Sequence, residues 1–324
     1  MLAERLKAGS RHILFEEKPK SEELSLWIQK AFRERMPLIF ISAMGIAVRA
    51  IAPFVRDKTW DSPVIVLDET GKNVIPILSG HLGGANAIAK SLAEVLGADL
   101  VLTTATDLQG VFAVDVFAAE NGFYIPDKEG IKEISSKLLK GEIVKMAPLV
   151  PVRILGDVPS NVEIIKKEQT TLRKTQVDVW IDERKQDGFT LFPRKLVLGM
   201  GCKKGKTFEE LLAFISSIYD PAYLREDLYA IATVEAKENE VGLIKLARYF
   251  GGKFLTYSAV ELESIEGEFP ASAFVEETVG VSNVCERAAI MGAGLHQREL
   301  ELEKTTGNGM TLAAAKRKEF LLRF

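Results

Sequence analysis

The chain has 324 residues, a formal net charge of −3, and 47% hydrophobic and 27% charged side chains. This composition is typical of a folded protein and excludes a disordered one. The balanced charge excludes a generally basic nucleic-acid-binding protein. Two cysteines and three histidines cannot build a disulfide framework or a structural zinc site, so we expect no metal site and a reducing, cytoplasmic location. The apolar runs are too short for a membrane span, so we expect no membrane association.

Hydrophobic patterning predicts alternating helices and strands over the first 110 residues. A helix at 2–7 is followed by a strand at 12–15 and a helix at 21–33, for which Ser21 is the expected N-cap. The further elements expected here are a strand at 38–42, a helix at 44–52, strands at 64–67 and 74–78 joined by a turn at 68–72, a helix at 85–96 and a strand at 100–103. Residues 1–110 are therefore predicted to form a doubly wound, Rossmann-like α/β domain.

The remaining chain is predicted to contain two further parts. Residues 111–192 are rich in proline and less regular, which favours a small α/β middle module or an extended linker. Residues 193–324 are predicted to form a second α/β domain, with a capping box of Thr207 and Glu210. Its expected elements are a strand at 196–198, a glycine/lysine loop at 199–206, a helix at 207–218, a strand at 228–234, a helix at 242–250, a strand at 253–257, a helix at 283–291 and a hairpin at 300–314.

The first candidate site is a glycine-rich segment between a strand and a helix. Backbone N–H groups at a helix start attract anions, and glycines let a ligand approach the main chain. His81 is an expected general base, since a neutral imidazole can take a proton from water near pH 7. The alternatives are a simple tight turn and a histidine that only positions its neighbours. The candidate binding residues of this segment are Ser79, Gly80, Gly83, Gly84 and Asn86.

A second candidate site is the segment from residue 199 to 207. It ends like a Walker A loop, but its glycines are wrongly spaced, and Lys204 stands where the Rossmann fingerprint needs its third glycine. What remains is a cationic loop suited to a polycarboxylated ligand, with a solvated surface turn as the alternative. Its candidate binding residues are Gly199, Gly201, Lys203 and Lys204.

Further candidates lie at other expected strand ends and loops. Glu276 or Glu277 is a candidate acid or base beside the donor Thr278, although adjacent glutamates on a loop are ordinarily solvated. Additional candidate binding residues are Arg49, Thr104 and Asp107. Cys202 lies among lysines that would lower the pKa of its thiol, but we favour a packing role for it because no histidine partner is evident.

Taken together, these segments resemble one known family. MGIAVR (44–49), SGHLGGAN (79–86) and TTATD (103–107) resemble the N-terminal domain of the cobalamin-biosynthesis CbiG family, the cobalt-precorrin-5A hydrolases. LGMGCKKG (198–205) and FVEETVGVS (274–282) resemble its C-terminal domain. The likeness extends in matching order over roughly residues 38 to 315.

The resemblance implies a reaction of the anaerobic cobalamin pathway. Water opens the ring A δ-lactone of cobalt-precorrin-5A, and the extruded meso carbon leaves as acetaldehyde, giving cobalt-precorrin-5B. No protein cofactor is implied, because the substrate carries the cobalt. Other enzymes of that pathway are compatible partners. The alternative is a carrier that binds the corrinoid without catalysis.

The resemblance also suggests roles for the candidate residues. His81, or else Glu276 or Glu277, would activate water, and amides of the glycine loop would receive the oxyanion. Carboxylate arms of the substrate would be held by the three cations Arg49, Lys203 and Lys204.

Overall fold

A computed structural model describes residues 2–9, 15–57, 60–104, 110–166, 177–269 and 283–324. The chain divides into two compact units, Met1–Val116 and Phe117–Phe324, called here unit 1 and unit 2. Each unit has its own sheets and hydrophobic cores. No helix within the described ranges has both the length and the apolar character needed to cross a membrane.

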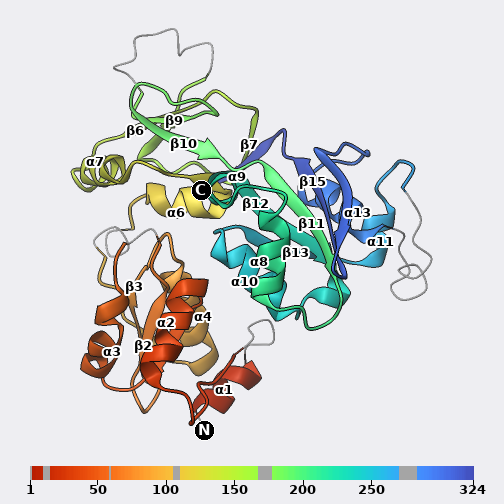
Figure 1. The fold of residues 1–324 in the computed structure, drawn as a ribbon. Helices are drawn as coiled ribbons and strands as arrows, with labels where there is room; N and C mark the ends of the chain where they lie inside the picture. The colour runs from red at the N-terminus through yellow and green to blue at the C-terminus, as the bar shows by residue number, and fades with distance from the viewer. Residues whose placement is uncertain (1, 10–14, 58–59, 105–109, 167–176, 270–282) are drawn as a thin grey trace. The chain divides into compact units, whose positions relative to one another are not determined.

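Unit 1 follows the predicted alternation of helices and strands (Figure 1). Its elements are α1 (Leu2–Gly9), α2 (Leu24–Glu34), β1 (Leu38–Ile41), α3 (Met44–Ile51), η1 (Ala52–Phe54), β2 (Val64–Leu67), β3 (Asn73–Leu78), α4 (Ala85–Leu96) and β4 (Asp99–Leu100). The expected strand at 12–15 lies, apart from Phe15, outside the described residues. The strand expected at 100–103 is shorter and begins one residue earlier.

The predicted N-cap of α2 is wrong. Glu23 occupies the N-cap position and makes no side-chain hydrogen bond there. Ser21 instead lies inside a turn that is closed by a hydrogen bond from the Glu22 N–H to the Pro19 carbonyl. The N-cap therefore lies two residues later than predicted, because Ser21 is part of the preceding turn.

The four-stranded sheet of unit 1 has the order β1-β2-β3-β4 and mixed directions. Strands β1 and β2 are parallel, β2 and β3 form the predicted antiparallel hairpin, and β3 and β4 are parallel. At the turn, the Asp68 carboxylate accepts hydrogen bonds from Thr70 and Asn73, which hold the pKa of Asp68 far below its usual range. The carboxyl ends of β1 and β2 therefore lie at one edge of the sheet, and those of β3 and β4 lie at the opposite edge.

Helices cover both faces of this sheet, which confirms the doubly wound α/β prediction. On one face, Leu6 of α1 and Leu92 of α4 pack with Ile65 of β2. On the other, Phe32 of α2 packs with the neighbouring strand residue Val64. Alternate residues of β2 thus serve two separate cores, as expected for a strand buried on both sides.

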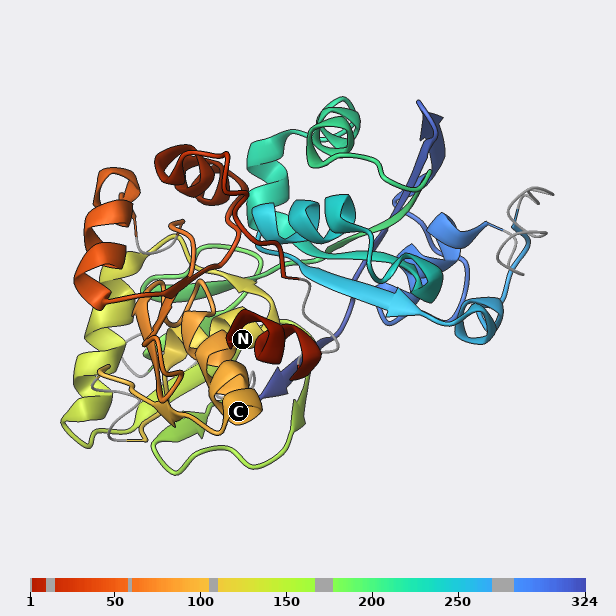
Figure 2. The ribbon, with the colours of Figure 1, turned by 90° about the horizontal axis from the view of Figure 1, so that it is seen from below.

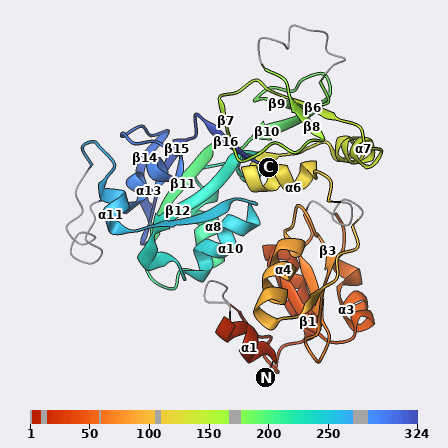
Figure 3. The same ribbon diagram turned by 180° about the vertical axis from the view of Figure 1, so that it is seen from behind.

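The first part of unit 2 is an α/β module, as predicted, and it contains more regular structure than the sequence suggested (Figure 3). Its sheet has the order β5-β10-β9-β6-β8. The elements are α6 (Val114–Asn121, which begins in unit 1), β5 (Phe123–Tyr124), α7 (Lys128–Leu139), β6 (Val144–Pro148), β7 (Val152–Leu155), β8 (Val162–Ile164), β9 (Val179–Ile181) and β10 (Phe189–Pro193).

The second part of unit 2 is built on a sheet of order β13-β12-β11-β15-β14. Strands β11, β12 and β13 are parallel, and β15 and β14 complete the sheet as the predicted hairpin. The elements are β11 (Leu196–Cys202), α8 (Phe208–Ser216), α9 (Pro221–Asp227), β12 (Leu228–Val234), η4 (Glu235–Lys237), α10 (Val241–Tyr249), β13 (Lys253–Tyr257), α11 (Ala259–Glu263), α13 (Val284–Gly292), β14 (Leu302–Gly307), β15 (Met310–Lys316) and β16 (Phe320–Arg323). The domain boundaries expected at 110/111 and 192/193 stay predictions.

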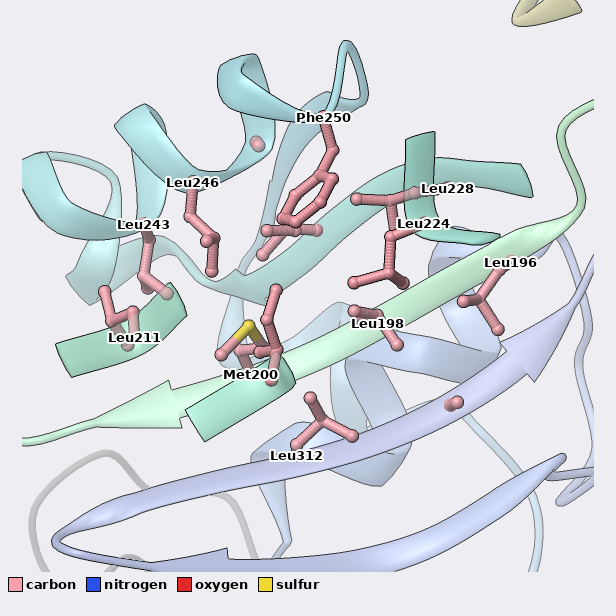
Figure 4. Packing of buried hydrophobic residues seen from close by; sticks show 14 of the residues in the cluster. Leu196, Leu198, Met200, Leu211, Leu224, Leu228, Leu243, Leu246, Phe250 and Leu312 are labelled. Atoms are coloured by element: carbon pink, nitrogen blue, oxygen red, sulfur yellow. The ribbon is translucent and has the colours of Figure 1, made fainter. Parts of the chain in front are cut away.

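Two hydrophobic cores, one on each face, stabilise this second sheet. Helices α8, α9 and α10 cover one face, where Leu198 and Met200 of β11 meet Leu243 and Leu246 of α10 (Figure 4). Helix α13 covers the other face, so that green and cyan helices lie on one side of the sheet and blue helices on the other (Figure 2). The capping box of Thr207 and Glu210 is confirmed at the start of α8.

Strand β11 is longer than predicted and includes the first half of the expected glycine/lysine loop. Gly199 pairs with β12 on one side and with β15 on the other. A Cβ atom at this position would lie 1.8 Å from the Cys285 carbonyl oxygen of α13. Gly199 is therefore explained by the close approach of a helix backbone, and its expected location in a loop is wrong.

Replacing Gly199 tests this packing. We expect Gly199→Ala to lower the free energy of unfolding by about 3 kcal/mol or more, because a backbone carbonyl cannot move aside as a side chain can. Gly201→Ala is the matched control, since its Cβ would meet only the Thr311 hydroxyl, at 2.7 Å. We expect the control to cost less than about 1 kcal/mol in urea unfolding. Equal losses for both variants would contradict the packing explanation.

Candidate functional site

The glycine-rich segment of unit 1 forms a compact loop between β3 and α4. Ser79 adopts a left-handed backbone conformation with φ of 55°, and its hydroxyl donates to the Asp61 carbonyl over 2.9 Å. A Cβ atom at Gly83 would lie 2.4 Å from Ser79 Cβ, so the loop closes only with glycine at that position. Gly84, with φ of 83°, is the N-cap of α4.

Several amides of this loop are already used within the loop. The Gly84 N–H donates to the His81 carbonyl, and the Ala85 and Asn86 N–H groups donate to the Ser79 and Gly80 carbonyls. The donor–acceptor distances of these three hydrogen bonds are 2.9, 3.1 and 3.0 Å, in that order. The expectation that amides at this helix start attract an anion is therefore wrong for these three, which already have carbonyl partners. None of them can receive an oxyanion without breaking a bond that shapes the loop.

His81 forms a close pair with Asp115, which sequence reasoning did not identify. His81 Nδ1 lies 3.0 Å from Asp115 Oδ2, and the two side chains are only 13% and 15% exposed. Asp115 lies in the first turn of α6, where the Val116 N–H donates to its other oxygen. Burial raises the pKa of Asp115, but the hydrogen bond and charge of His81 outweigh it, so that the pKa of Asp115 is lowered.

This geometry orients the imidazole for proton transfer. An ionised carboxylate only accepts hydrogen bonds, so Nδ1 carries the proton when His81 is neutral. In that tautomer Nε2 holds the lone pair that can take a proton from water. A base whose second nitrogen is held by a carboxylate is a recurrent arrangement in hydrolytic sites. Sequence reasoning assigned little chemistry to residues 111–192, and the only local signal was one carboxylate among the apolar residues 112–118.

The other candidates of unit 1 lie at different edges of its sheet. Thr104 is exposed and follows β4, which runs parallel to β3 toward the edge that carries His81. Arg49 is exposed on α3, which follows β1 at the opposite edge. Its guanidinium extends back along α3, since a Cβ at Gly45 would lie 3.7 Å from Arg49 Nη2. The sheet therefore does not bring Arg49 beside His81, and its role as a carboxylate clamp stays a prediction.

The cationic loop of unit 2 is confined to the residues that follow β11. Lys203 and Lys204 are exposed, and neither side chain forms an ion pair or hydrogen bond with any residue that the structure describes. Lys206, by contrast, is paired with Glu210 at 2.6 Å. Gly201 belongs to β11 and not to this loop.

Cys202 is not an activated thiol. Burial raises its pKa, and the nearby lysines Lys237 and Lys206 offset only part of this effect. The lowered thiol pKa suggested by the lysines in the sequence is therefore wrong, and the favoured packing role fits the contact of Cys202 with the core of the second sheet.

The remaining predicted residues have no described position. Asp107, Glu276, Glu277 and Thr278 all lie outside the described residues, so their roles stay predictions. Within the described ranges, no group of three or more His, Cys, Asp or Glu side chains is arranged to hold a metal ion.

The His81–Asp115 pair predicts a pH-dependent contribution to stability. Because the pKa of Asp115 is lowered on folding, its ionised form contributes stability above the ordinary value of 3.8, and this is lost as the pH falls through the folded pKa. We expect Asp115→Asn to cost about 1–3 kcal/mol in urea unfolding at pH 6. The difference from the unmodified chain should shrink below about pH 4, whereas a constant difference would contradict the pairing.

Comparisons with known proteins agree with the motifs. The family model described as cobalamin synthesis G N-terminal matches residues 26–107, and that described as cobalamin synthesis G C-terminus matches residues 196–315. The cobalt-precorrin-5A hydrolase of Priestia megaterium is 31% identical over 315 residues, covering 91% of this chain and 82% of that protein. The cobalt-precorrin-5A hydrolase of Salmonella typhimurium is 35% identical over 302 residues, covering 88% and 83%. Protein CobE of Sinorhizobium sp is 30% identical over 122 residues, covering 37% and 79%.

The two matched segments together cover more than half of the chain, and they contain the glycine loop of unit 1 and the cationic loop of unit 2. The two cobalt-precorrin-5A hydrolases match over most of their own length and of this chain. The chain therefore belongs to the CbiG family of cobalamin-synthesis proteins.

Proposed function

We propose that this chain is a cobalt-precorrin-5A hydrolase, which opens the ring A δ-lactone of its substrate and releases acetaldehyde. The observation that supports the proposal most directly is the 3.0 Å contact between His81 and Asp115, which orients the imidazole at the glycine loop. Family membership supports the substrate class, since curated relatives bear the name of this activity. The substrate supplies the cobalt.

The first step is hydrolysis of the lactone. His81 Nε2 takes a proton from water, and the water oxygen forms a bond to the lactone carbonyl carbon. The acyl C–O bond then breaks, which frees the ring A acetate. Protonation of the departing oxygen leaves a hydroxyl group on the carbon that carries the methyl group. Asp115 stabilises the imidazolium that forms in this step.

The second step is cleavage of a carbon–carbon bond. The hydroxyl group loses its proton, a C=O bond forms at the methyl-bearing carbon, and the bond from this carbon to the macrocycle breaks. The electron pair of that bond moves into the electron-poor cobalt macrocycle, so the step needs no added oxidant or reductant. Acetaldehyde leaves, and the product is cobalt-precorrin-5B.

The cationic loop supports the same substrate class. The precursor carries several acetate and propionate arms, and the ammonium groups of Lys203 and Lys204 have no described acidic partner. Such groups bind carboxylates in an otherwise slightly acidic protein, whose net charge is −3. We assign these two lysines to substrate binding and not to the chemical steps.

Substitution of His81 tests whether this residue is the base that activates water. We expect His81→Gln to lower the rate of acetaldehyde release by about 10² to 10⁴, because water then lacks its base. Acetaldehyde is measured with the lactone substrate and a coupled alcohol dehydrogenase. His296→Gln is the matched control, since this exposed histidine takes no part in the proposed site, and we expect it to leave the rate unchanged. Unchanged release from the His81 variant would remove the assignment.

Asp115→Asn should change the pH dependence as well as the rate. The carboxylate favours the protonated imidazole, so removing its charge should move the acidic limb of the kcat/KM profile to lower pH. We also expect roughly a tenfold or larger loss of kcat, because the amide can stabilise the wrong tautomer. A lower rate with an unmoved profile would show that Asp115 only supports the fold. Corrinoid binding by the unmodified chain without any acetaldehyde would instead establish the carrier function.

A further inference from the structure

A glutamate from the segment between η4 and α10 fixes the turn that follows β11. Glu240, at the N-cap of α10, accepts a hydrogen bond from the Gly205 N–H over 2.7 Å. Its other oxygen accepts from the Lys237 ammonium over 3.1 Å. The Glu240 side chain is only 10% exposed, whereas the turn that it holds is exposed. Both oxygens of Glu240 therefore have partners within unit 2.

The same turn is held from a second side by the β14–β15 hairpin. The Lys203 N–H donates to the Gly309 carbonyl over 3.0 Å. The aliphatic stem of Lys203 lies over this glycine, since a Cβ at Gly309 would come within 3.0 Å of Lys203 Cδ. Two contacts thus fix the backbone on either side of Lys204, while the two ammonium groups extend from an exposed turn.

We propose that Glu240 is the positioning residue of a carboxylate-binding subsite formed by Lys203 and Lys204. The subsite takes the carboxylate arms of the corrinoid, and in this respect the inference rests on the proposed function. Glu240 touches no substrate. It acts through its hydrogen bond with the Gly205 amide. This bond fixes where the chain turns after Lys204 and therefore the positions of the two lysine side chains.

A positioning role and a purely electrostatic role for Glu240 predict opposite changes in anion binding when the glutamate is removed. A carboxylate near two lysines reduces their attraction for anions, so its removal on electrostatic grounds alone would strengthen anion binding. Removal of a positioning hydrogen bond would weaken binding, because the turn loses its fixed geometry. The sign of the change therefore separates the two roles.

Binding titrations with two probes measure the subsite without requiring turnover. The first is a cobalt corrin whose arms are free carboxylates, and the second is cobalamin, whose arms are amides. We expect Lys203→Ala/Lys204→Ala to weaken binding of the carboxylate probe by about tenfold at low salt, with little change for cobalamin. Equal weakening of both probes would overturn the assignment of the lysines to carboxylates.

The Glu240 variants are then compared in the same titration. We expect Glu240→Ala to weaken carboxylate binding by roughly threefold or more, and Glu240→Gln to restore it, because the amide oxygen still accepts from Gly205. Glu238→Ala is the matched control, since this exposed glutamate accepts a hydrogen bond from the Asn239 side chain and not from the turn. In the Lys203→Ala/Lys204→Ala background, Glu240→Ala should add no further loss.

Kinetics with the lactone substrate provide the second measurement. We expect Glu240→Ala to raise KM and leave kcat nearly unchanged, since Glu240 acts on binding alone. Tighter carboxylate binding by Glu240→Ala, or additive losses in the triple variant, would overturn the positioning role. Absence of acetaldehyde from the unmodified chain with intact lysine-dependent binding would overturn the hydrolase and leave the subsite standing.

Discussion

The antiparallel pairing of β2 with β3 determines which side chains unit 1 brings together. Because the hairpin reverses the chain, the loop after β3 emerges at the edge opposite the carboxyl ends of β1 and β2. The start of α6 then supplies Asp115 to that loop. Because of the same reversal, Arg49, on the helix that follows β1, lies at the edge opposite the glycine loop. A fully parallel sheet would instead have gathered all the strand ends at one edge, as ligand sites in doubly wound folds usually require.

The glycine loop is fixed before any ligand arrives. Its own carbonyls accept from the amides that begin α4, and the Ser79 hydroxyl ties it to Asp61. A loop of this kind has little freedom left, so the backbone that carries His81 needs little further ordering. The rigidity also has a chemical consequence. Stabilisation of negative charge in the reaction has to come from groups other than the amides of Gly84, Ala85 and Asn86.

Sequence patterns predicted local structure well where local forces decide it. Strands β12 and β13 match the predicted bounds, and the Thr207 capping box follows from side chains within one helical turn. The sequence did not reveal contacts between distant segments. Asp115 lies 34 residues from His81, and Gly199 resembles a loop residue until the approach of α13 is known. Glycine has the same sequence signature whether a turn or a crossing helix requires it.

The pairing of β16 with β7 has a consequence for how unit 2 forms during synthesis. β16 lies parallel to β7, and the Asn121 side chain bonds both the N–H and the carbonyl of Arg323, 202 residues away. Contacts of such sequence separation form late, since the intervening chain has to be made first. Until then β7 presents an unsatisfied strand edge to other nascent chains. A fragment that stops after β10 would keep that edge open permanently and be prone to self-association.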